Sequence, residues 1–154
     1  MTGSEFGDPI RELERNIRQA SVIIRKRGRD ILADFDITPP QFNALLVLSE
    51  ASGLTMGELC DRLYLACSTA TDLIDRMERN GLIERERDVN DRRVIRLKVT
   101  DKGFAVVDQV MAARCRYLAC ILKHVEDQER EQLSVSLKRL NELMTKEMEI
   151  VPAD

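Results

Sequence analysis

Two adjacent arginines stand in the stretch DVNDRRVIRLKVTDKG, residues 88–103. The β-forming residues after them alternate with charged ones, which predicts a strand, and DVND before them predicts a turn. Arg92 and Arg93 are therefore expected near the tip of a hairpin. Two such cations could serve a negatively charged partner, although an ordinary charged turn has the same composition.

The charge of the whole chain does not by itself indicate a nucleic-acid partner. Its 154 residues carry 24 Lys and Arg against 27 Asp and Glu, for a formal net charge of −3. A nucleic-acid-binding domain is usually basic, so the charge has to be judged locally. Between residues 62 and 102, cations are interleaved with nearly as many acids. This mixture predicts modest non-specific affinity and a steep dependence on salt.

Four cysteines form no CxxC pair and have no secretory context, which favours reduced thiols. Cys67 is expected in the first turn of a helix, where the positive helix end can make a thiol more reactive. Cys60 on the preceding helix could be its redox partner, although a small half-buried residue is the simpler interpretation of Cys67. Cys115 and Cys120 are expected in the core. No Cys/His cluster has ligand spacing, so no metal is expected.

Motifs for catalysis are missing from the sequence. The one histidine, His124, has no nucleophile motif near it, and neither a glycine-rich phosphate loop nor HExxH nor GxSxG occurs. We therefore expect no enzyme, no catalytic residue and no cofactor. Neither an 18-residue apolar run nor a signal-peptide pattern is present, so a cytoplasmic protein without a membrane span is expected. Residues 1–9 are interpreted as a tag remnant or a disordered segment.

The middle of the chain, residues 35–100, predicts a winged helix-turn-helix domain. Helical spacing of apolar residues over three consecutive stretches gives way to the alternation that is typical of strands. Two short helices with a tight turn between them form a helix-turn-helix, and a hairpin after them is a wing. The expected helices cover residues 37–53, 55–63 and 66–81, and the expected strands cover residues 82–87 and 93–99.

Local signals mark the ends of these helices. Thr38 and Gln41 have the spacing of a capping box, in which each side chain bonds the backbone of the other. Thr55 and Glu58 repeat this spacing at the next helix. Gly53 is expected to end the first helix, because glycine readily adopts the left-handed conformation at a helix end.

Residues 10–34 and 101–150 predict long helices outside the winged domain. The last of them, over about 126–149, carries Leu133, Leu137, Leu140 and Met144 at intervals of four, three and four, which is typical of a helix–helix seam. So much apolar surface exceeds what a small domain can cover. We therefore expect a homodimer held by these two segments, and a fold that is mainly α with a small β-hairpin wing.

The stretches ITPPQFNALLVL and LIDRMERNGLIERERDVNDRRVIRLKVTDKG, with the order of helices around them, resemble the MarR family of bacterial transcription regulators. The resemblance covers about residues 10–149 and is most specific in the wing, from Asp91 to the DKG at 101–103. It implies a triangular homodimer on double-stranded DNA. The helix that begins near Cys67 would lie in a major groove, and the wing would reach the adjacent minor groove.

The resemblance also implies which residues meet the DNA. Arg92 and Arg93 would serve a narrow minor groove, whose negative potential attracts arginine, and Asp91 would fix the direction of an arginine. On the recognition helix, the face opposite the apolar residues has to be the DNA-facing one. Its candidate contacts are Ser68, Thr69 and Thr71 for bases or phosphates, Asp72 for a cytosine amino group, and Arg76 and Arg79 for phosphates.

The sequence departs from the usual family pattern at two positions of this helix. Ala66 replaces a common capping serine, which removes about 1 kcal/mol of local stabilisation. Asp72 stands where relatives often have a basic or small residue, so an operator sequence cannot simply be transferred from them. An acid there repels phosphates but can accept a hydrogen bond from cytosine.

The signal that such a regulator senses has two interpretations. Family members commonly bind phenolic or aromatic carboxylate ligands between the dimer helices and the winged domain, here framed by residues 10–34, 39–51 and 101–124. The resemblance therefore implies a repressor that a small molecule releases from a pseudo-palindromic operator. The alternative is a redox-sensing regulator acting through Cys67 with Cys60. A winged helix that binds only proteins is a further alternative, against which the basic wing tip argues.

Overall fold

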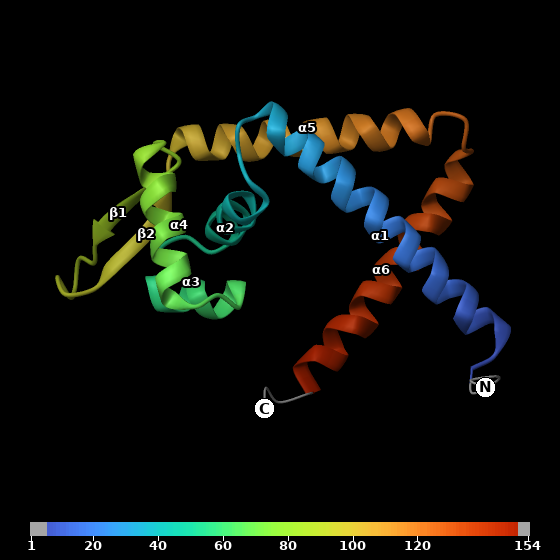
Figure 1. The fold of residues 1–154 in the computed structure, drawn as a ribbon, viewed down its shortest axis with the longest axis horizontal. Helices are drawn as coiled ribbons and strands as arrows, with labels where there is room; N and C mark the ends of the chain where they lie inside the picture. Colours follow the sequence, from blue (N-terminus) through green and yellow to red (C-terminus); the bar gives the residue numbers. More distant parts are fainter. Residues whose placement is uncertain (1–5, 151–154) are drawn as a thin grey trace. The chain divides into compact units, whose positions relative to one another are not determined.

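The computed structural model describes residues 6–150, which form helices and one two-stranded sheet in two compact units (Figure 1). The first unit runs to Arg114 and contains the winged domain, and the second begins at Cys115 within a long helix. The elements are α1 (Asp8–Asp34), α2 (Pro39–Glu50), α3 (Met56–Leu63), α4 (Cys67–Arg79), β1 (Ile83–Arg87), β2 (Ile95–Val99), α5 (Asp101–Ile121) and α6 (Asp127–Ile150).

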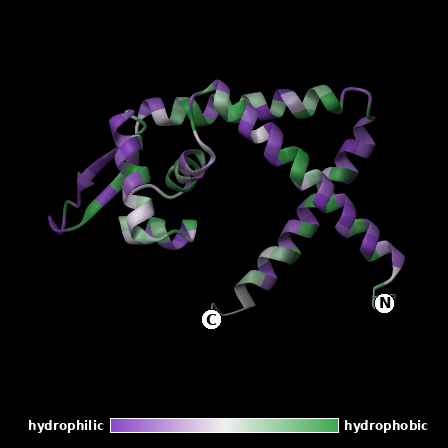
Figure 2. Cartoon of the chain, viewed as in Figure 1, coloured by the Kyte–Doolittle hydropathy of each residue, from purple (hydrophilic) through white to green (hydrophobic). Residues whose placement is uncertain are grey.

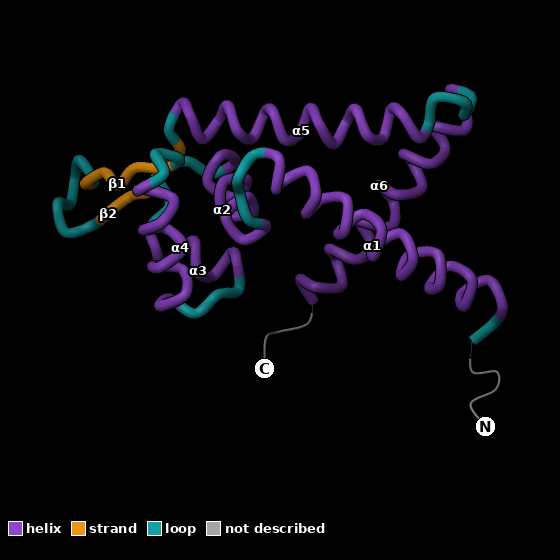
Figure 3. Tube along the Cα trace, turned by 45° about the horizontal axis from the view of Figure 1, so that its top comes forward, coloured by secondary structure: helices purple, strands orange, loops and turns teal. Residues whose placement is uncertain are grey.

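This order confirms the predicted fold class, mainly α with a hairpin wing. In Figure 3 the paired strands follow α4 directly, as the sequence predicted. Helix α1 begins at Asp8, so the end of the segment interpreted as a tag remnant is helical. Residues 1–5 of that segment lie outside the described residues.

Both predicted capping boxes are present. The Thr38 hydroxyl accepts a hydrogen bond from the Gln41 backbone N–H at 3.4 Å, and the Gln41 side-chain oxygen accepts one from the Thr38 N–H at 3.0 Å. Thr55 and Glu58 make the same exchange at the start of α3. The end of α2 was predicted wrongly, because the helix stops at Glu50 and Gly53 lies beyond it in a left-handed conformation, with φ of +78°.

The core of the winged domain joins α2, α3 and α4 to the inner face of the hairpin. Strands β1 and β2 are antiparallel, and Ile83 pairs with Val99. Leu97 also forms a bridge with Leu54 in the α2–α3 loop, so that loop is held against β2. The largest fully buried side chains of these elements are Phe42, Leu45, Leu48, Leu59, Ile74, Met77, Ile83 and Leu97.

The terminal helices leave much apolar surface uncovered. Only Ile31 and Leu32 are buried on α1. Hydrophobic and hydrophilic residues alternate along α1 and α6 in Figure 2. Among the exposed apolar side chains are Ile10, Val22, Ile23 and Ile24 on α1 and Leu133, Leu137 and Met144 on α6. Three of the four residues of the predicted seam on α6 are thus solvent-facing in a single chain, and the fourth, Leu140, is half-buried.

The two cysteines of α5 were placed wrongly. Cys115 and Cys120 were expected in the core, but both are exposed. The helix carries apolar residues on several sides, among them the exposed Met111 and Leu118. On such a helix, the spacing of apolar residues does not show which side packs against the rest of the chain and which side is exposed.

The start of α5 is fixed by a close approach to Leu82, just before β1, and to Val99 at the end of β2. The Thr100 hydroxyl donates to the Gly81 carbonyl at 2.6 Å and accepts from the Gly103 N–H at 3.1 Å. Gly103 is buried, and a Cβ there would lie 2.2 Å from the Leu82 carbonyl oxygen and 2.6 Å from a Val99 methyl carbon. Only glycine fits between the helix and this backbone.

Gly103→Ala should therefore destabilise the protein by about 1–3 kcal/mol, the usual range for overpacking. Gly57→Ala is the matched control, because nothing lies within 4 Å of a Cβ at that position of α3. It should be neutral or stabilising by up to about 1 kcal/mol, since alanine favours a helix. Urea unfolding followed by circular dichroism measures both, and equal stability of the two variants would contradict the close contact.

Candidate nucleic-acid interface

Helix α4 is divided into a buried face and an exposed polar face. Ala70, Ile74 and Met77 are fully buried, and Leu73 is half-buried beside them. The helix is amphipathic, so burying these residues fixes its rotation about its own axis. The predicted DNA-facing residues are all exposed: Ser68, Thr69, Thr71, Asp72, Arg76 and Arg79.

Hydrogen bonds within α4 restrict two of these side chains. The Thr71 hydroxyl donates to the Cys67 carbonyl at 2.8 Å, so its proton is used within the helix and its oxygen remains an acceptor. The Arg79 Nε donates to the Asp75 carbonyl at 3.3 Å. As expected, Ala66 provides no side-chain cap. The first amides of α4 therefore keep hydrogen-bonding capacity that a phosphate can use.

Arg85 joins α4 to the wing. It donates to the Asp75 carboxylate at 2.7 Å and to the Glu78 carboxylate at 2.5 Å, bridging the end of α4 and strand β1. By helical spacing alone, Asp75 would lie on the outward face of α4. In the structure its carboxylate instead pairs with Arg85 of β1. Arg85 is likewise occupied, which removes it from the cations available to a partner.

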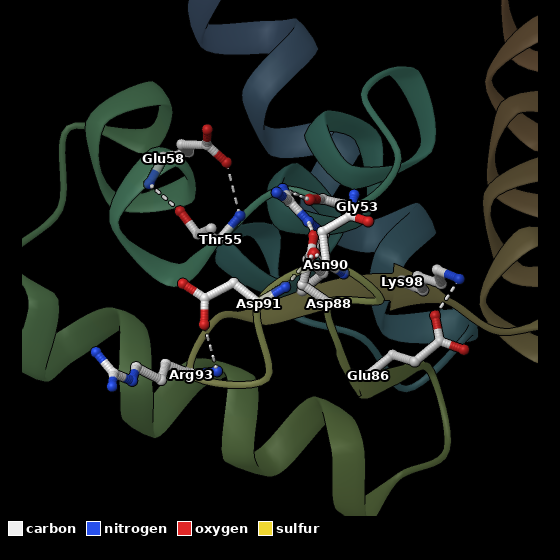
Figure 4. Close-up of polar contacts among 10 residues, drawn as sticks. Gly53, Thr55, Glu58, Glu86, Asp88, Asn90, Asp91, Arg93 and Lys98 are labelled. Atoms are coloured by element: carbon white, nitrogen blue, oxygen red, sulfur yellow. Dashed lines mark hydrogen bonds and ion pairs between the residues drawn. The ribbon is translucent and has the colours of Figure 1, made fainter.

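The turn of the wing is organised by Asp88. One carboxylate oxygen accepts from the backbone N–H groups of Asn90 and Asp91 at 2.8 and 3.1 Å, and the other pairs with Arg96 (Figure 4). The Arg96 guanidinium also donates to the Gly53 carbonyl at 2.8 Å. The hydrogen bond from Arg96, followed by those from the two backbone amides, lowers the pKa of Asp88 to about 2.

Sequence reasoning missed this network. An aspartate at the first position of a turn often bonds the backbone two residues on, so half of the network had a local signal. The bond to Gly53 spans 43 residues and had none.

The predicted wing residues lie together at the tip. Arg92 and Arg93 are exposed, as is Asp91. The Asp91 carboxylate accepts a hydrogen bond from the Arg93 backbone N–H at 3.0 Å, and the dashed line in Figure 4 ends on that nitrogen. We expected Asp91 to fix the direction of an arginine. The contact acts on the backbone of Arg93 and not on its guanidinium, so Asp91 holds the turn that carries the cation.

Pairing reduces the number of cations that this region can offer. Besides Arg85 and Arg96, Lys98 is paired with Glu86 across the sheet, and the Lys102 ammonium donates to the Asn80 carbonyl at 2.7 Å. The exposed arginines of the winged domain are Arg76 and Arg79 on α4, Arg92 and Arg93 at the wing tip, Arg62 on α3 and Arg87 at the end of β1.

The thiols of Cys60 and Cys67 are neighbours across the turn between α3 and α4. Cys60 is buried and Cys67 is exposed. Burial raises the pKa of the Cys60 thiol, and the adjacent Cys67 sulfur raises it further. The predicted pair is thus brought together, with one sulfur open to solvent. Within residues 6–150, no three Cys, His, Asp or Glu side chains gather as a metal site would require.

A second polar feature lies where α1, α2 and α5 meet. The Arg114 guanidinium carbon is 4.7 Å from the centroid of the Phe42 ring, which is within cation–π range. A Cβ at Gly28 of α1 would lie 3.9 Å from an Arg114 nitrogen. A cation is thereby held beside an aromatic ring in the region that the sequence framed for a ligand.

Three packed helices followed by a hairpin, with the polar face of the third helix exposed, define a winged helix-turn-helix protein. The MarR family profile matches residues 37–95. The chain is 41% identical to YsmB, an HTH-type transcriptional regulator of Bacillus subtilis, over 88% of this chain and 92% of the relative. The chain belongs to the MarR family.

Two further comparisons support the assignment. A MarR family protein from Bacillus stearothermophilus has a solved structure that is 42% identical, with a TM-score of 0.85 over 92% of this chain and 99% of that one. The organic hydroperoxide resistance transcriptional regulator of Bacillus subtilis is 38% identical over 51% of this chain and 53% of its own. None of the helices in the described part of the chain has the length and hydrophobicity to span a membrane.

Asp88→Asn should make stability depend differently on pH. The folded pKa of Asp88 is about 2, below the roughly 3.9 of an unfolded aspartate. Its ionised form therefore stabilises the fold above pH ~4, and this contribution is lost as pH falls through about 2. The wild type should be more stable than the variant at neutral pH, and the difference should shrink between about pH 4 and pH 2. Denaturant unfolding across this range measures it, and parallel curves would contradict the pairing.

Proposed function

We propose that this protein is a ligand-responsive transcriptional regulator that binds double-stranded DNA as a homodimer. In this proposal it represses its target until a small molecule releases it from a pseudo-palindromic operator. One observation carries the proposal: the exposed polar face of α4 and the exposed wing arginines belong to one domain, in which Arg85, Arg96 and Lys98 are paired with acids. A protein with this role works in the cytoplasm, where bacterial DNA lies.

Helix α4 reads the major groove in this proposal. Ser68 and Thr69 offer hydroxyls near the helix start, and Thr71 offers a methyl group and an acceptor oxygen. Asp72 accepts from a cytosine amino group, and Arg76 and Arg79 meet phosphates further along the helix.

The wing completes the interface. Arg93 enters the minor groove, and Arg92 supports it or meets a phosphate. The hydrogen bond between Asp91 and the Arg93 backbone supports this arrangement, since it holds the turn from which the guanidinium extends.

A second copy of the chain covers the terminal helices. On α1, Val22, Ile23 and Ile24 are 56–63% exposed, and Leu137 of α6 is 59% exposed. So much apolar surface is costly in water and typical of an interface. A dimer also suits the DNA, because two recognition helices about 34 Å apart meet successive major grooves.

The proposed effector is a small aromatic or phenolic carboxylate. Arg114 supplies a cation that can pair with a carboxylate, and the fully buried Phe42 ring beneath it holds the guanidinium in place. Because Arg114 lies on α5 and Phe42 on α2, a ligand there would contact both the winged domain and a helix that leads away from it. Binding could then change the spacing of the recognition helices.

The proximity of Cys60 and Cys67 favours a second candidate, a thiol-based redox regulator. The exposed Cys67 sulfur would attack a hydroperoxide, forming a sulfenic acid and releasing an alcohol, or water from hydrogen peroxide. The Cys60 thiol would then displace water from the sulfenic acid, forming a disulfide. The two thiols are oxidised and the O–O bond is reduced. The named relative concerned with organic hydroperoxide resistance supports this alternative.

Replacing Arg92 or Arg93 with Ala should weaken operator binding by about tenfold and flatten the salt dependence by about one unit for each phosphate that is no longer bound. Folding should survive, because both side chains are exposed. Ser68→Ala and Thr71→Ala should instead lower discrimination between operator and random DNA. Titration of each variant at two salt concentrations tests this, with Arg139→Ala as a control that removes one exposed charge from α6. Unchanged affinity of the double wing variant would end the wing assignment.

Salicylate and hydrogen peroxide should separate the two signals. If a carboxylate is sensed, salicylate weakens DNA binding of the wild type and of Arg116→Met, and does so much less for Arg114→Met. If thiols are sensed, peroxide releases DNA, dithiothreitol restores binding, and Cys67→Ser abolishes the response while Cys120→Ser keeps it. Gel-shift titrations measure both. Release by peroxide alone, dependent on Cys67, would replace the small-molecule proposal with the redox one.

A further inference from the structure

We propose that Arg96 is a positioning residue for DNA binding, which sets the wing relative to the helix-turn-helix and does not itself touch DNA. The inference rests on the proposed function, because it assumes that the wing arginines bind DNA. It starts from the two bonds that one guanidinium makes. Arg96 pairs with Asp88 at the base of the wing turn and donates to the Gly53 carbonyl between α2 and α3.

The Gly53 side of this connection is well fixed. The Gly53 N–H donates to the Leu97 carbonyl at 3.2 Å, and the Leu97 N–H donates to the Leu54 carbonyl at 2.8 Å. Gly53 has a φ of +78°, a conformation that side-chain-bearing residues rarely adopt. Glu58, in the first turn of α3, also attracts Arg96 electrostatically. Arg96 is therefore tied to the same loop and helix that lead into the helix-turn-helix.

The Asp88 side reaches the wing tip. The carboxylate oxygen that Arg96 leaves free accepts the N–H groups of Asn90 and Asp91, and Asp91 in turn accepts the N–H of Arg93. A continuous chain of hydrogen bonds thus runs from the α2–α3 loop to the residue proposed for the minor groove (Figure 4). Without Arg96, the loop between β1 and β2 would be held to the domain by its strands alone.

The consequence for binding is entropic. A wing that is already oriented loses less conformational freedom when it meets DNA, so binding is tighter than for a freely moving wing with the same cations. Lys98 provides a matched comparison on the same strand. Its ammonium pairs with Glu86 across the sheet, and this ion pair links only the two strands of the hairpin. Removing it takes away the same charge but leaves the bonds from Arg96 to Asp88 and to the α2–α3 loop in place.

The test is a double-mutant cycle that uses a DNA duplex selected by the wild-type protein from a random-sequence pool. Arg96→Met and Lys98→Met are made in the wild type and in the Arg92→Ala, Arg93→Ala variant. We expect Arg96→Met to weaken binding about tenfold in the wild type and to have little effect once the wing arginines are gone, since coupled residues act non-additively. Lys98→Met should change little in either background.

Asp88→Asn gives an independent variant that keeps an oxygen for the turn amides but loses the charge opposite Arg96. It should reproduce the loss of Arg96→Met, and thermal unfolding should show each variant folded at the assay temperature. An equal loss from Arg96→Met in both backgrounds would overturn the inference, because it would indicate a direct DNA contact or a general structural role. No loss in the wild type would overturn it too. Failure of the proposed wing function is distinguishable, since the Arg92, Arg93 variant would then bind as well as the wild type.

Discussion

Burial of one face of α4 is the constraint on which the rest of the interface depends. Ala70, Ile74 and Met77 are removed completely from solvent, and a helix packed through three such positions cannot rotate without exposing them. The opposite face is then presented outward whatever its own composition. None of the polar residues from Ser68 to Asp72 is needed for packing, so in the proposed complex they are free to vary with the DNA sequence.

The distribution of charge in the winged domain is a second constraint on DNA binding. A chain with a net charge of −3 has to bind DNA, which is a polyanion. It has no overall positive charge that would attract DNA. Arg85 is bound to Asp75 and Glu78, and Arg96 to Asp88, so two cations and three acids of the domain are paired internally. The exposed arginines of the domain include the four proposed to contact DNA, which are Arg76 and Arg79 on α4 and Arg92 and Arg93 on the wing. With few free cations, DNA affinity depends more on where each cation lies than on non-specific attraction to phosphates. That attraction weakens as salt rises, and the decrease is steeper when more phosphates are contacted.

Local chemistry explains which parts of this structure could be predicted from the sequence. The capping boxes at Thr38 and Thr55 involve residues three apart, and the hairpin follows from alternation within one short stretch, Ile83–Val99. The hydrogen bond from Arg96 to Gly53 joins segments that are distant in the sequence, and no pattern of residue spacing predicts it. The same holds for the ion pair of Arg85 with Asp75. The family resemblance located the wing tip correctly, but the hydrogen bond from the Arg93 backbone amide to Asp91 is seen only in the structure.

The terminal helices could be predicted as elements but not as buried or exposed ones, and the reason leads back to function. Helix α1 has 27 residues, of which Ile31 and Leu32 alone are buried. Most helical stability in proteins comes from packing an apolar face, so a helix of this kind is incomplete without another surface. In the proposed dimer, that surface belongs to the second copy, and the helices that join the copies also set the distance between the two wings. A ligand beside Arg114, at the junction of α1, α2 and α5, would then change how these helices pack. In the proposed dimer this packing determines both the stability of the helices and the distance between the two recognition helices.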